Sequence, residues 1–226
     1  MKIQLESGVE DVRNLVGEKL GRGKVFLVGG FVRDQLRHRV SKDIDIATSA
    51  DPESTKQAFP YGYASHFGTV SFKLNGYSIT IATRRKEDGY QDFRHPKHIT
   101  YVTTREEDCL RRDFTINALY ADCEGNLFDP TGHGRKDIKK KRLSRIGKPR
   151  KRLEEDPLRI LRAFRFSKEL NLKITHRLYR SRIKSKDLIL NLKKGKIREE
   201  VNKCPEKFRQ ERVETLSLRF AFEEEQ

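Results

Sequence analysis

Two aspartates one residue apart, Asp43 and Asp45, are the side chains of this sequence whose spacing most clearly indicates chemistry. They follow an apolar run at 25–28 and the glycine pair Gly29–Gly30. Side chains of a β-strand alternate between its two faces, so both carboxylates should point the same way. Two like charges held this close repel unless a cation lies between them, and oxygen ligands suit Mg²⁺ better than zinc. We therefore predict a magnesium site at Asp43 and Asp45.

The glycine pair stands where an expected strand meets an expected helix. Glycine lets the backbone approach a phosphate closely, and the N-terminus of a helix favours anions. Phosphates beside a carboxylate-bound metal are what nucleotidyl transfer requires. A glycine pair alone is usually a turn, and Asp-x-Asp alone is usually a solvated strand edge. Their order along the chain, which is strand, Gly29–Gly30, Arg33–Asp34 and then Asp43–Asp45, is far more specific than either motif alone.

That order resembles the signature of the DNA polymerase β-like nucleotidyltransferases, in particular the class II tRNA nucleotidyltransferases and the bacterial poly(A) polymerases. The resemblance spans residues 23–204, and further motifs follow in the family's order. These motifs are HFGTV at 66–70 with ITIATRR at 79–85, YQDFRHP at 90–96, EED at 106–108 with RRDFTINAL at 111–119, DPTG at 129–132, EDPLR at 155–159 and KGKIREEVNK at 194–203.

The resemblance implies an α+β fold in two domains. A mixed-sheet nucleotidyltransferase head is expected at 1–146, and an all-helical neck that selects the nucleotide and binds RNA is expected at 147–226. Larger members of the family continue into helical body and tail domains that hold tRNA, and the resemblance predicts that this chain lacks them. A homo-oligomer or a partner subunit would then replace that surface.

The resemblance also implies roles for individual residues. Asp43 and Asp45 are expected to be catalytic and to hold Mg²⁺. The residues expected to bind the nucleotide are Gly29, Gly30, Arg33, Arg111, Arg112, Asp113, Asn117, Asp156, Arg159 and Arg162. The glycines and Arg33 would contact the triphosphate, and segment 111–117 would read the ribose. An Asp–Arg pair three residues apart on one helical face would present an acceptor and a donor to a base edge, although the same pair could be a simple intrahelical ion pair.

The implied function is template-independent addition of nucleotides to RNA 3′ ends by a two-metal mechanism. The main candidate is the addition of CCA, or part of it, to tRNA from CTP and ATP. Segment 92–96 favours CCA addition. The alternatives are a poly(A) polymerase, an enzyme that adds only part of CCA, and a catalytically weak RNA-binding derivative. The last arises because Thr80 stands where family members often carry a third acidic residue. The turn at 129–137 is also one residue longer than usual, which leaves the role of Gly134 open.

Composition agrees with a polyanionic partner. The 226 residues carry a net charge of +16, and segment 135–165 holds fourteen Lys or Arg against four acidic residues. Such charge predicts attraction to nucleic acid. No apolar run is long enough to span a membrane, the N-terminus matches neither a signal nor a transit peptide, and three cysteines without metal-ligand spacing read as reduced thiols. We therefore predict a cytoplasmic protein that is not bound to a membrane.

Hydrophobic patterning predicts the elements that must position these residues. The head should be a mixed sheet with helices on one side, and the rest should be helical. The expected elements are helices at 9–20 and 31–37, strands at 25–28 and 44–47, a helix opened by 51–53, a hairpin of 70–74 with 77–83 around Asn75–Gly76, a long helix after Pro157, and helices at 178–192 and 197–218 broken at 191–195 and 205.

Overall fold

The computed structural model describes residues 1–65, 68–90, 96–216, 218 and 221. Most of the expected loop motif at 90–96, and residues 66–67 of the motif before it, lie outside the described residues. The chain forms two compact units, one of Met1–Glu87 with Ile99–Ile138 and the other of Asp88–His98 with Lys139–Gln226. The functional boundary expected at residue 146 remains a prediction.

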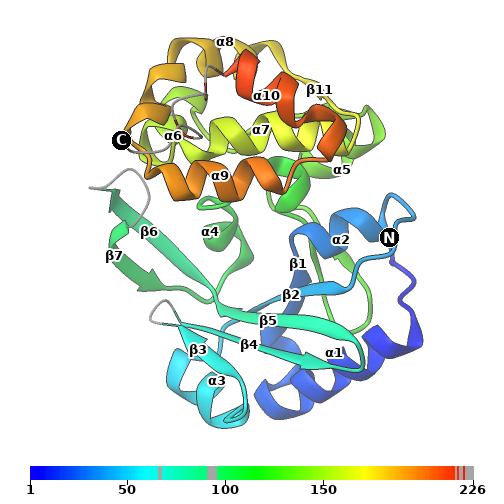
Figure 1. The fold of residues 1–226 in the computed structure, drawn as a ribbon. Helices are drawn as coiled ribbons and strands as arrows, with labels where there is room; N and C mark the ends of the chain where they lie inside the picture. The colour runs from blue at the N-terminus through cyan, green and yellow to red at the C-terminus, as the bar shows by residue number, and fades with distance from the viewer. Residues whose placement is uncertain (66–67, 91–95, 217, 219–220, 222–226) are drawn as a thin grey trace. The chain divides into compact units, whose positions relative to one another are not determined.

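The first unit is built on a seven-stranded mixed sheet (Figure 1). Its strands, in spatial order, are β3 (Tyr63–Ser65), β4 (Thr69–Leu74), β5 (Tyr77–Thr83), β2 (Asp43–Thr48), β1 (Val25–Val28), β8 (Tyr120–Ala121) and β9 (Leu127–Phe128). Only β2 and β5 pair in parallel, and the other neighbours are antiparallel. The predicted α+β class with a mixed sheet is confirmed.

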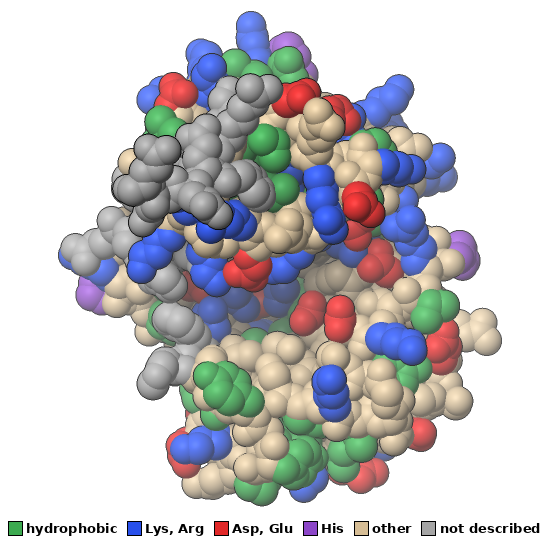
Figure 2. All heavy atoms as spheres, viewed as in Figure 1, with side chains coloured by type: hydrophobic (Ala, Val, Ile, Leu, Met, Phe, Trp, Pro, Cys, Tyr) green, Lys and Arg blue, Asp and Glu red, His purple; other side chains and the backbone are tan. Residues whose placement is uncertain are grey.

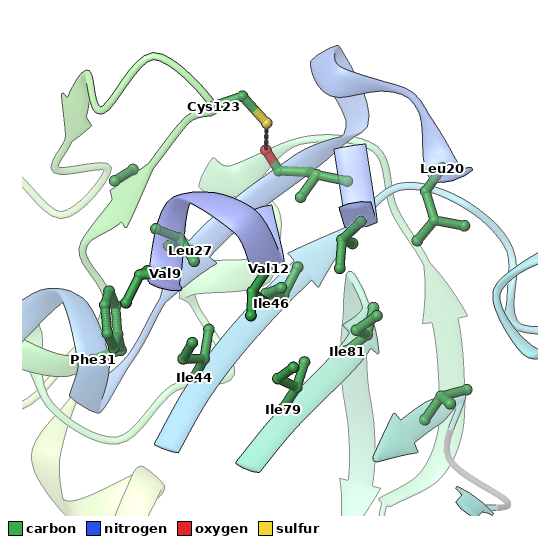
Figure 3. Packing of buried hydrophobic residues seen from close by; sticks show 14 of the residues in the cluster. Val9, Val12, Leu20, Leu27, Phe31, Ile44, Ile46, Ile79, Ile81 and Cys123 are labelled. Carbon is green, nitrogen blue, oxygen red and sulfur yellow. Dashed lines mark hydrogen bonds between the residues drawn. The ribbon is translucent and has the colours of Figure 1, made fainter. Parts of the chain in front are cut away.

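One face of this sheet carries the core, and helices α1 (Ser7–Leu20) and α3 (Pro52–Ala58) cover it. The alternating isoleucines of β2 and β5 point toward α1 (Figure 3). These buried side chains are Val12 and Val16 of α1 with Ile44, Ile46, Ile79 and Ile81 of the strands. Because the period of a strand is two, every residue between these isoleucines points to the opposite face. That opposite face therefore receives Asp43, Asp45 and Thr80.

The turn chemistry agrees with the sequence. Asn75 and Gly76 have φ values of 50° and 79°, and both are positive as the two-residue turn of a hairpin requires. The Asp51 carboxylate accepts a hydrogen bond from the Ser54 amide at 2.8 Å and caps α3. The paired ribbon of β6 (Arg85–Tyr90) and β7 (Pro96–Tyr101) was not expected. Its first strand, β6, is mostly charged and lacks the alternation of apolar and polar residues from which a strand is predicted in a sequence.

The second unit is mainly helical and has a core of its own. Its elements are α6 (Pro149–Glu155), α7 (Leu158–Glu169), α8 (His176–Lys184), the 3₁₀ turn η3 (Lys186–Asn191), α9 (Lys194–Asn202) and α10 (Arg209–Thr215). The helix expected at 178–192 was wrong in its extent, because α8 ends at Lys184 and a 3₁₀ turn follows it. The break expected at 205 is confirmed, since α9 ends at Asn202 and the missing N–H of Pro205 cannot continue a helix. The region is also not wholly helical, since β11 (Lys173–Ile174) pairs with β10 (Arg142–Leu143).

Candidate nucleotide-binding site

The two predicted catalytic carboxylates lie on the sheet face opposite the core. Asp45 pairs in register with Val28 on one side and with Thr80 on the other, so these side chains form one row across three strands. Asp43 is exposed and Asp45 is half-buried. Strand β2 thus holds two carboxylates on one face with access to solvent, as the alternation predicted.

The Gly29–Gly30 pair lies directly beside this row. Gly29 has a φ of 74°, and a Cβ built on it would stand 3.0 Å from Asp45 Oδ2. A side chain here would be strained and would also crowd the carboxylate. Helix α2 (Gly30–Gln35) begins at the second glycine. The glycines therefore keep the backbone open at the point where the carboxylates are exposed.

Three of the predicted nucleotide-binding residues form a hydrogen-bonded chain. Arg33 is buried and donates from Nη1 to Asn117 Oδ1 at 2.7 Å, and Asn117 Nδ2 donates to Asp113 Oδ1 at 3.1 Å. Asp34 accepts from Arg33 Nε at 2.9 Å and Nη2 at 2.7 Å, which fixes the plane of the guanidinium. Side-chain hydrogen bonds therefore join helix α2 to the segment around Asp113, although the two are far apart in the sequence.

The other two arginines of that segment converge on Asp108, which is fully buried. Arg111 Nε donates to Asp108 Oδ1 at 2.8 Å, and Arg112 Nη2 donates to Oδ2 at 3.0 Å. The Tyr120 hydroxyl donates to the same Oδ2 at 2.6 Å. This arrangement is not a surface salt bridge, because one carboxylate inside the protein accepts hydrogen bonds from both guanidinium groups.

The charge of Asp108 is stable despite its burial. Desolvation alone would raise its pKa, but the Arg112 and Arg111 charges and the Tyr120 hydrogen bond outweigh that cost and hold the pKa well below its usual range. Burial raises the pKa of Tyr120, so its hydroxyl keeps the proton that it donates. Sequence reasoning gave Asp108 and Tyr120 no role. The available signal was a tyrosine in the otherwise apolar run that follows Asn117.

Gly134 supports the same segment from behind. A Cβ at this position would lie 2.5 Å from the carbonyl oxygen of Thr115, so only glycine permits the observed packing. The Thr115 hydroxyl donates to Asp137 Oδ2 at 2.7 Å, and both side chains are buried. Although the turn is longer than usual, Gly134 has a structural role. It lets the backbone pack closely against the loop that carries Asp113.

The second unit brings Asp156 and Arg159 together, but not in the expected way. Asp156 has φ −149° and ψ 93° and lies before α7, so the prediction that both residues share one helical face was wrong. The side chains still meet, with Arg159 Nε 3.3 Å from Asp156 Oδ2. Asp156 Oδ1 also accepts from the Leu158 amide at 3.1 Å.

Arg159 is buried among further partners within this unit. Its Nη1 donates to the carbonyl oxygen of Arg152 at 2.9 Å and lies 3.6 Å from Glu155 Oε2. Arg162 follows three residues later in α7, with its guanidinium 5.3 Å from the centre of the Phe166 ring. The Asp156–Arg159 contact is thus part of a structural network, and its role in reading a base remains a prediction.

The possible ligands for a metal are two carboxylates rather than three. The Thr80 hydroxyl lies 3.2 Å from that of Ser71 on the next strand, so an uncharged pair stands beside Asp45. Among the residues that the structure describes, no group of three or more His, Cys, Asp or Glu side chains could hold a metal ion. Mg²⁺ commonly uses one or two carboxylates together with water and substrate phosphates, and Asp43 with Asp45 fits that pattern.

Comparison with known proteins places this geometry in a family. The model of the poly(A) polymerase head domain matches residues 25–144, which is more than half of the chain. The chain therefore belongs to the poly(A) polymerase head domain family. The match covers the glycine pair, both β2 carboxylates and the segment from Asp108 to Gly134, so the residues brought together in the first unit all lie within it.

Individual relatives agree with this placement. The chain is 40% identical over 179 residues to the CCA-adding enzyme of Lactobacillus helveticus, covering 78% of this chain and 45% of that protein. It is 45% identical over 153 residues to that of Streptococcus pyogenes serotype M5, covering 67% and 38%. The crystal structure of the Bacillus stearothermophilus CCA-adding enzyme in complex with CTP matches with a TM-score of 0.77 and 30% identity, covering 88% and 49%. The chain thus spans less than half the length of these relatives.

Within the part of the chain that the structure describes, no helix is both long enough and apolar enough to cross a membrane. Cys109, Cys123 and Cys204 are buried free thiols, as their odd number and spacing indicated.

Proposed function

We propose that this chain adds nucleotides to RNA 3′ ends without a template, and that its reaction is CCA addition to tRNA from CTP and ATP. The observation that carries the proposal is the row on the open sheet face, where Asp45 lies against Gly29 and beside the chain from Arg33 to Asp113. Relatives named CCA-adding enzymes, one of them solved with CTP, support this choice of substrates.

In the proposed reaction, the 3′-hydroxyl oxygen of the RNA forms a bond to the α-phosphorus of the nucleotide. The bond from that phosphorus to the bridging oxygen breaks, pyrophosphate leaves, and the hydroxyl proton passes to solvent. Mg²⁺ held by Asp43 and Asp45 would supply Lewis-acid stabilisation of the charge on the phosphate oxygens. The open backbone at Gly29 and Gly30 admits the triphosphate to this face, and the Arg33 guanidinium contributes positive charge beside it.

The remaining site residues orient the nucleotide. Asp113 and Asn117, already held in one chain, would bind the ribose hydroxyl groups. Asp108 fixes the guanidinium planes of Arg111 and Arg112, so this segment is ordered before substrate arrives, which lowers the cost of binding. Asp156, Arg159 and Arg162 would contact the base. We further propose that a homo-oligomer or a partner subunit assists the grip on tRNA, which light scattering of the chain with and without tRNA would test.

One observation favours a second candidate. Thr80 and Ser71 place hydroxyl groups beside Asp45, and a hydroxyl brings no charge to a metal site. A catalytically weak derivative that binds RNA would have this feature. The two candidates differ in turnover, because the weak derivative should retain RNA without extending it.

The deciding experiment incubates the chain with tRNA that lacks its 3′-terminal CCA and with each labelled nucleotide in turn, in the presence of Mg²⁺. We expect two additions from CTP alone and a third when ATP is also present. A matched control compares Asp43→Asn with Glu53→Gln, which neutralises an exposed carboxylate on α3. A long adenylate tract would indicate a poly(A) polymerase, and RNA binding without incorporation would indicate the weak derivative. Incorporation that survives in Asp43→Asn would overturn the assigned site.

A further inference from the structure

Helix α8 differs from the other helices of the second unit in its charge. Its nine residues, HRLYRSRIK, contain four Lys or Arg and no acidic residue. Arg177, Arg180 and Lys184 are exposed, and at 3.6 residues per turn they lie within one narrow strip of the helix surface. Lys and Arg side chains project at the top of Figure 2, the region over α8 in Figure 1.

The cations of this strip have no carboxylate partner in the part of the chain that is described. Arg177, Arg180 and Lys184 form no ion pair there. Some lysines elsewhere in the same unit are paired, since Lys196 and Lys203 lie 2.7 Å and 2.8 Å from Glu199 oxygens. Lys168 likewise lies 2.5 Å from Glu211. Several cations on α7 and α9 thus have carboxylate partners, whereas the three exposed cations of α8 have none within the described residues.

A fourth cation of α8 lies beneath this surface. Arg182 is 7% exposed, and its Nε has no hydrogen-bond partner among the described residues. Its guanidinium lies 5.5 Å from the centre of the Tyr179 ring, and burial lowers its pKa. Like charges three and four residues apart destabilise a helix, so the positive charge of α8 costs stability in the free protein. A bound polyanion would remove that cost.

The flank of the strip adds apolar and aromatic surface. Tyr179 is 48% exposed and Ile183 is 49% exposed, and their four-residue spacing places them side by side next to the cations. An exposed aromatic ring beside a row of cations is how single-stranded nucleic acid is held, because bases stack on the ring while the cations bind the backbone. The Tyr179 ring also contacts the Arg182 guanidinium within the same helix.

We infer that the exposed face of α8 binds the RNA substrate, with Arg177, Arg180 and Lys184 on successive phosphates and Tyr179 stacked on an unpaired base. The inference rests on the proposed function, because RNA is the substrate that it places near this unit. From Arg177 to Lys184 the helix rises about 10 Å, over which one strand of a duplex presents about three phosphates. The three exposed cations match that number.

The test compares two triple variants that remove the same charge from the same unit. R177Q/R180Q/K184Q removes the unpaired row, and K168Q/K196Q/K203Q removes three lysines that already have carboxylate partners. Binding of tRNA without its CCA end is followed by fluorescence anisotropy over a KCl series. We expect the first variant to lower the slope of log K against log [KCl] by about 2 to 3, with at least tenfold weaker binding at the lowest salt. The second variant should stay within twofold of the unchanged protein.

A charge-retaining variant and two further measurements distinguish the possible outcomes. R177K/R180K retains the charge and should bind normally, and circular dichroism should show that every variant is folded. CTP incorporation at saturating RNA should survive in R177Q/R180Q/K184Q with a raised KM for RNA, whereas failure of the proposed function would abolish incorporation in the unchanged protein while leaving RNA binding intact. Equal losses in both triple variants, RNA binding without salt dependence, or binding to phosphatidylserine vesicles instead of RNA would each overturn the inference.

Discussion

The Asp43–Asp45 pair and Asp108 lie in opposite environments within the first unit. Asp43 and Asp45 stand on an open sheet face with their charges adjacent, and Asp43 forms no ion pair within the described residues. Asp108 has no exposed surface and is surrounded by Arg111, Arg112 and Tyr120. The two groups lie in the same unit, so the difference reflects what each position requires.

The difference in environment predicts different consequences for substitutions at the two positions. A buried charge is tolerated only when hydrogen bonds and opposite charges satisfy it, and Asp108 meets that condition. Two adjacent carboxylates on an open face repel each other, and a bound cation would relieve that repulsion. We therefore expect that changing the β2 pair affects activity and leaves stability intact, whereas changing Asp108 affects stability first.

The largest effect is expected on turnover. Asp43→Asn or Asp45→Asn should lower CTP incorporation by about a thousandfold or more, because the Lewis acid contributes several kcal/mol to charge stabilisation. The melting temperature should stay the same or rise slightly, since one of two repelling charges is removed. Incorporation assays and thermal unfolding on the same preparations would check both halves. A large fall in melting temperature would place the β2 pair in the same class as Asp108.

Replacing Asp108 should produce the opposite pattern. Asp108→Asn removes the fully buried charge that Arg111 and Arg112 share, and breaking a buried pair in this way costs about 3–5 kcal/mol of unfolding free energy. Glu107→Gln is the matched control, because it removes the neighbouring, solvent-accessible carboxylate that pairs with Lys86. That control should cost less than about 1 kcal/mol. Urea unfolding would measure both losses, and equal losses would show that burial of Asp108 does not make it more important for stability than an accessible carboxylate.

The same carboxylate should also make stability depend on pH in a defined direction. The pKa of Asp108 is lower in the folded protein than in the unfolded chain, so its contribution is fully present above the ordinary pKa of an aspartate. That contribution is lost as the pH falls through the folded-state pKa. The difference in unfolding free energy between the unchanged protein and Asp108→Asn should therefore narrow below about pH 4. A difference that stays constant from pH 7 to pH 3 would show that the charge of Asp108 is not what stabilises this segment.

The sequence could predict the parts of the site that depend on local periodicity. The face shared by Asp43 and Asp45 follows from strand alternation, and the Asn75–Gly76 turn follows from its need for positive φ. The partners of Arg33 could not be found in this way, because Asn117 lies eighty-four residues away and no local rule joins them. The same holds for Asp108, whose importance appears only when Tyr120 and two arginines meet it in the folded protein.

Asp156 combines features of the β2 carboxylates and of Asp108. It is partly exposed and meets Arg159 at 3.3 Å, so it has a partner as Asp108 does and access to solvent as Asp43 does. Periodicity predicted that it would share a helical face with Arg159. The break before α7 placed it outside the helix instead, because Pro157 disfavours helical backbone at the preceding residue. Its side chain can therefore cap α7, bind a base, or do both.

The smallest predicted effect decides between these roles. If Asp156 and Arg159 read the base, Asp156→Asn and Arg159→Gln should each relax discrimination of CTP and ATP against GTP and UTP by about ten- to a hundredfold, since a bidentate contact to a base contributes about 1–3 kcal/mol. Competition assays with paired labelled nucleotides would measure the ratio of kcat/KM values. Arg150→Gln is the control, because it breaks an exposed ion pair with Glu154 in the preceding helix and should leave the ratio unchanged. Unchanged selectivity in both site variants, together with a lower melting temperature, would assign the pair to the stabilising class of Asp108 and would leave nucleotide choice to Arg162 or to the segment around Asp113.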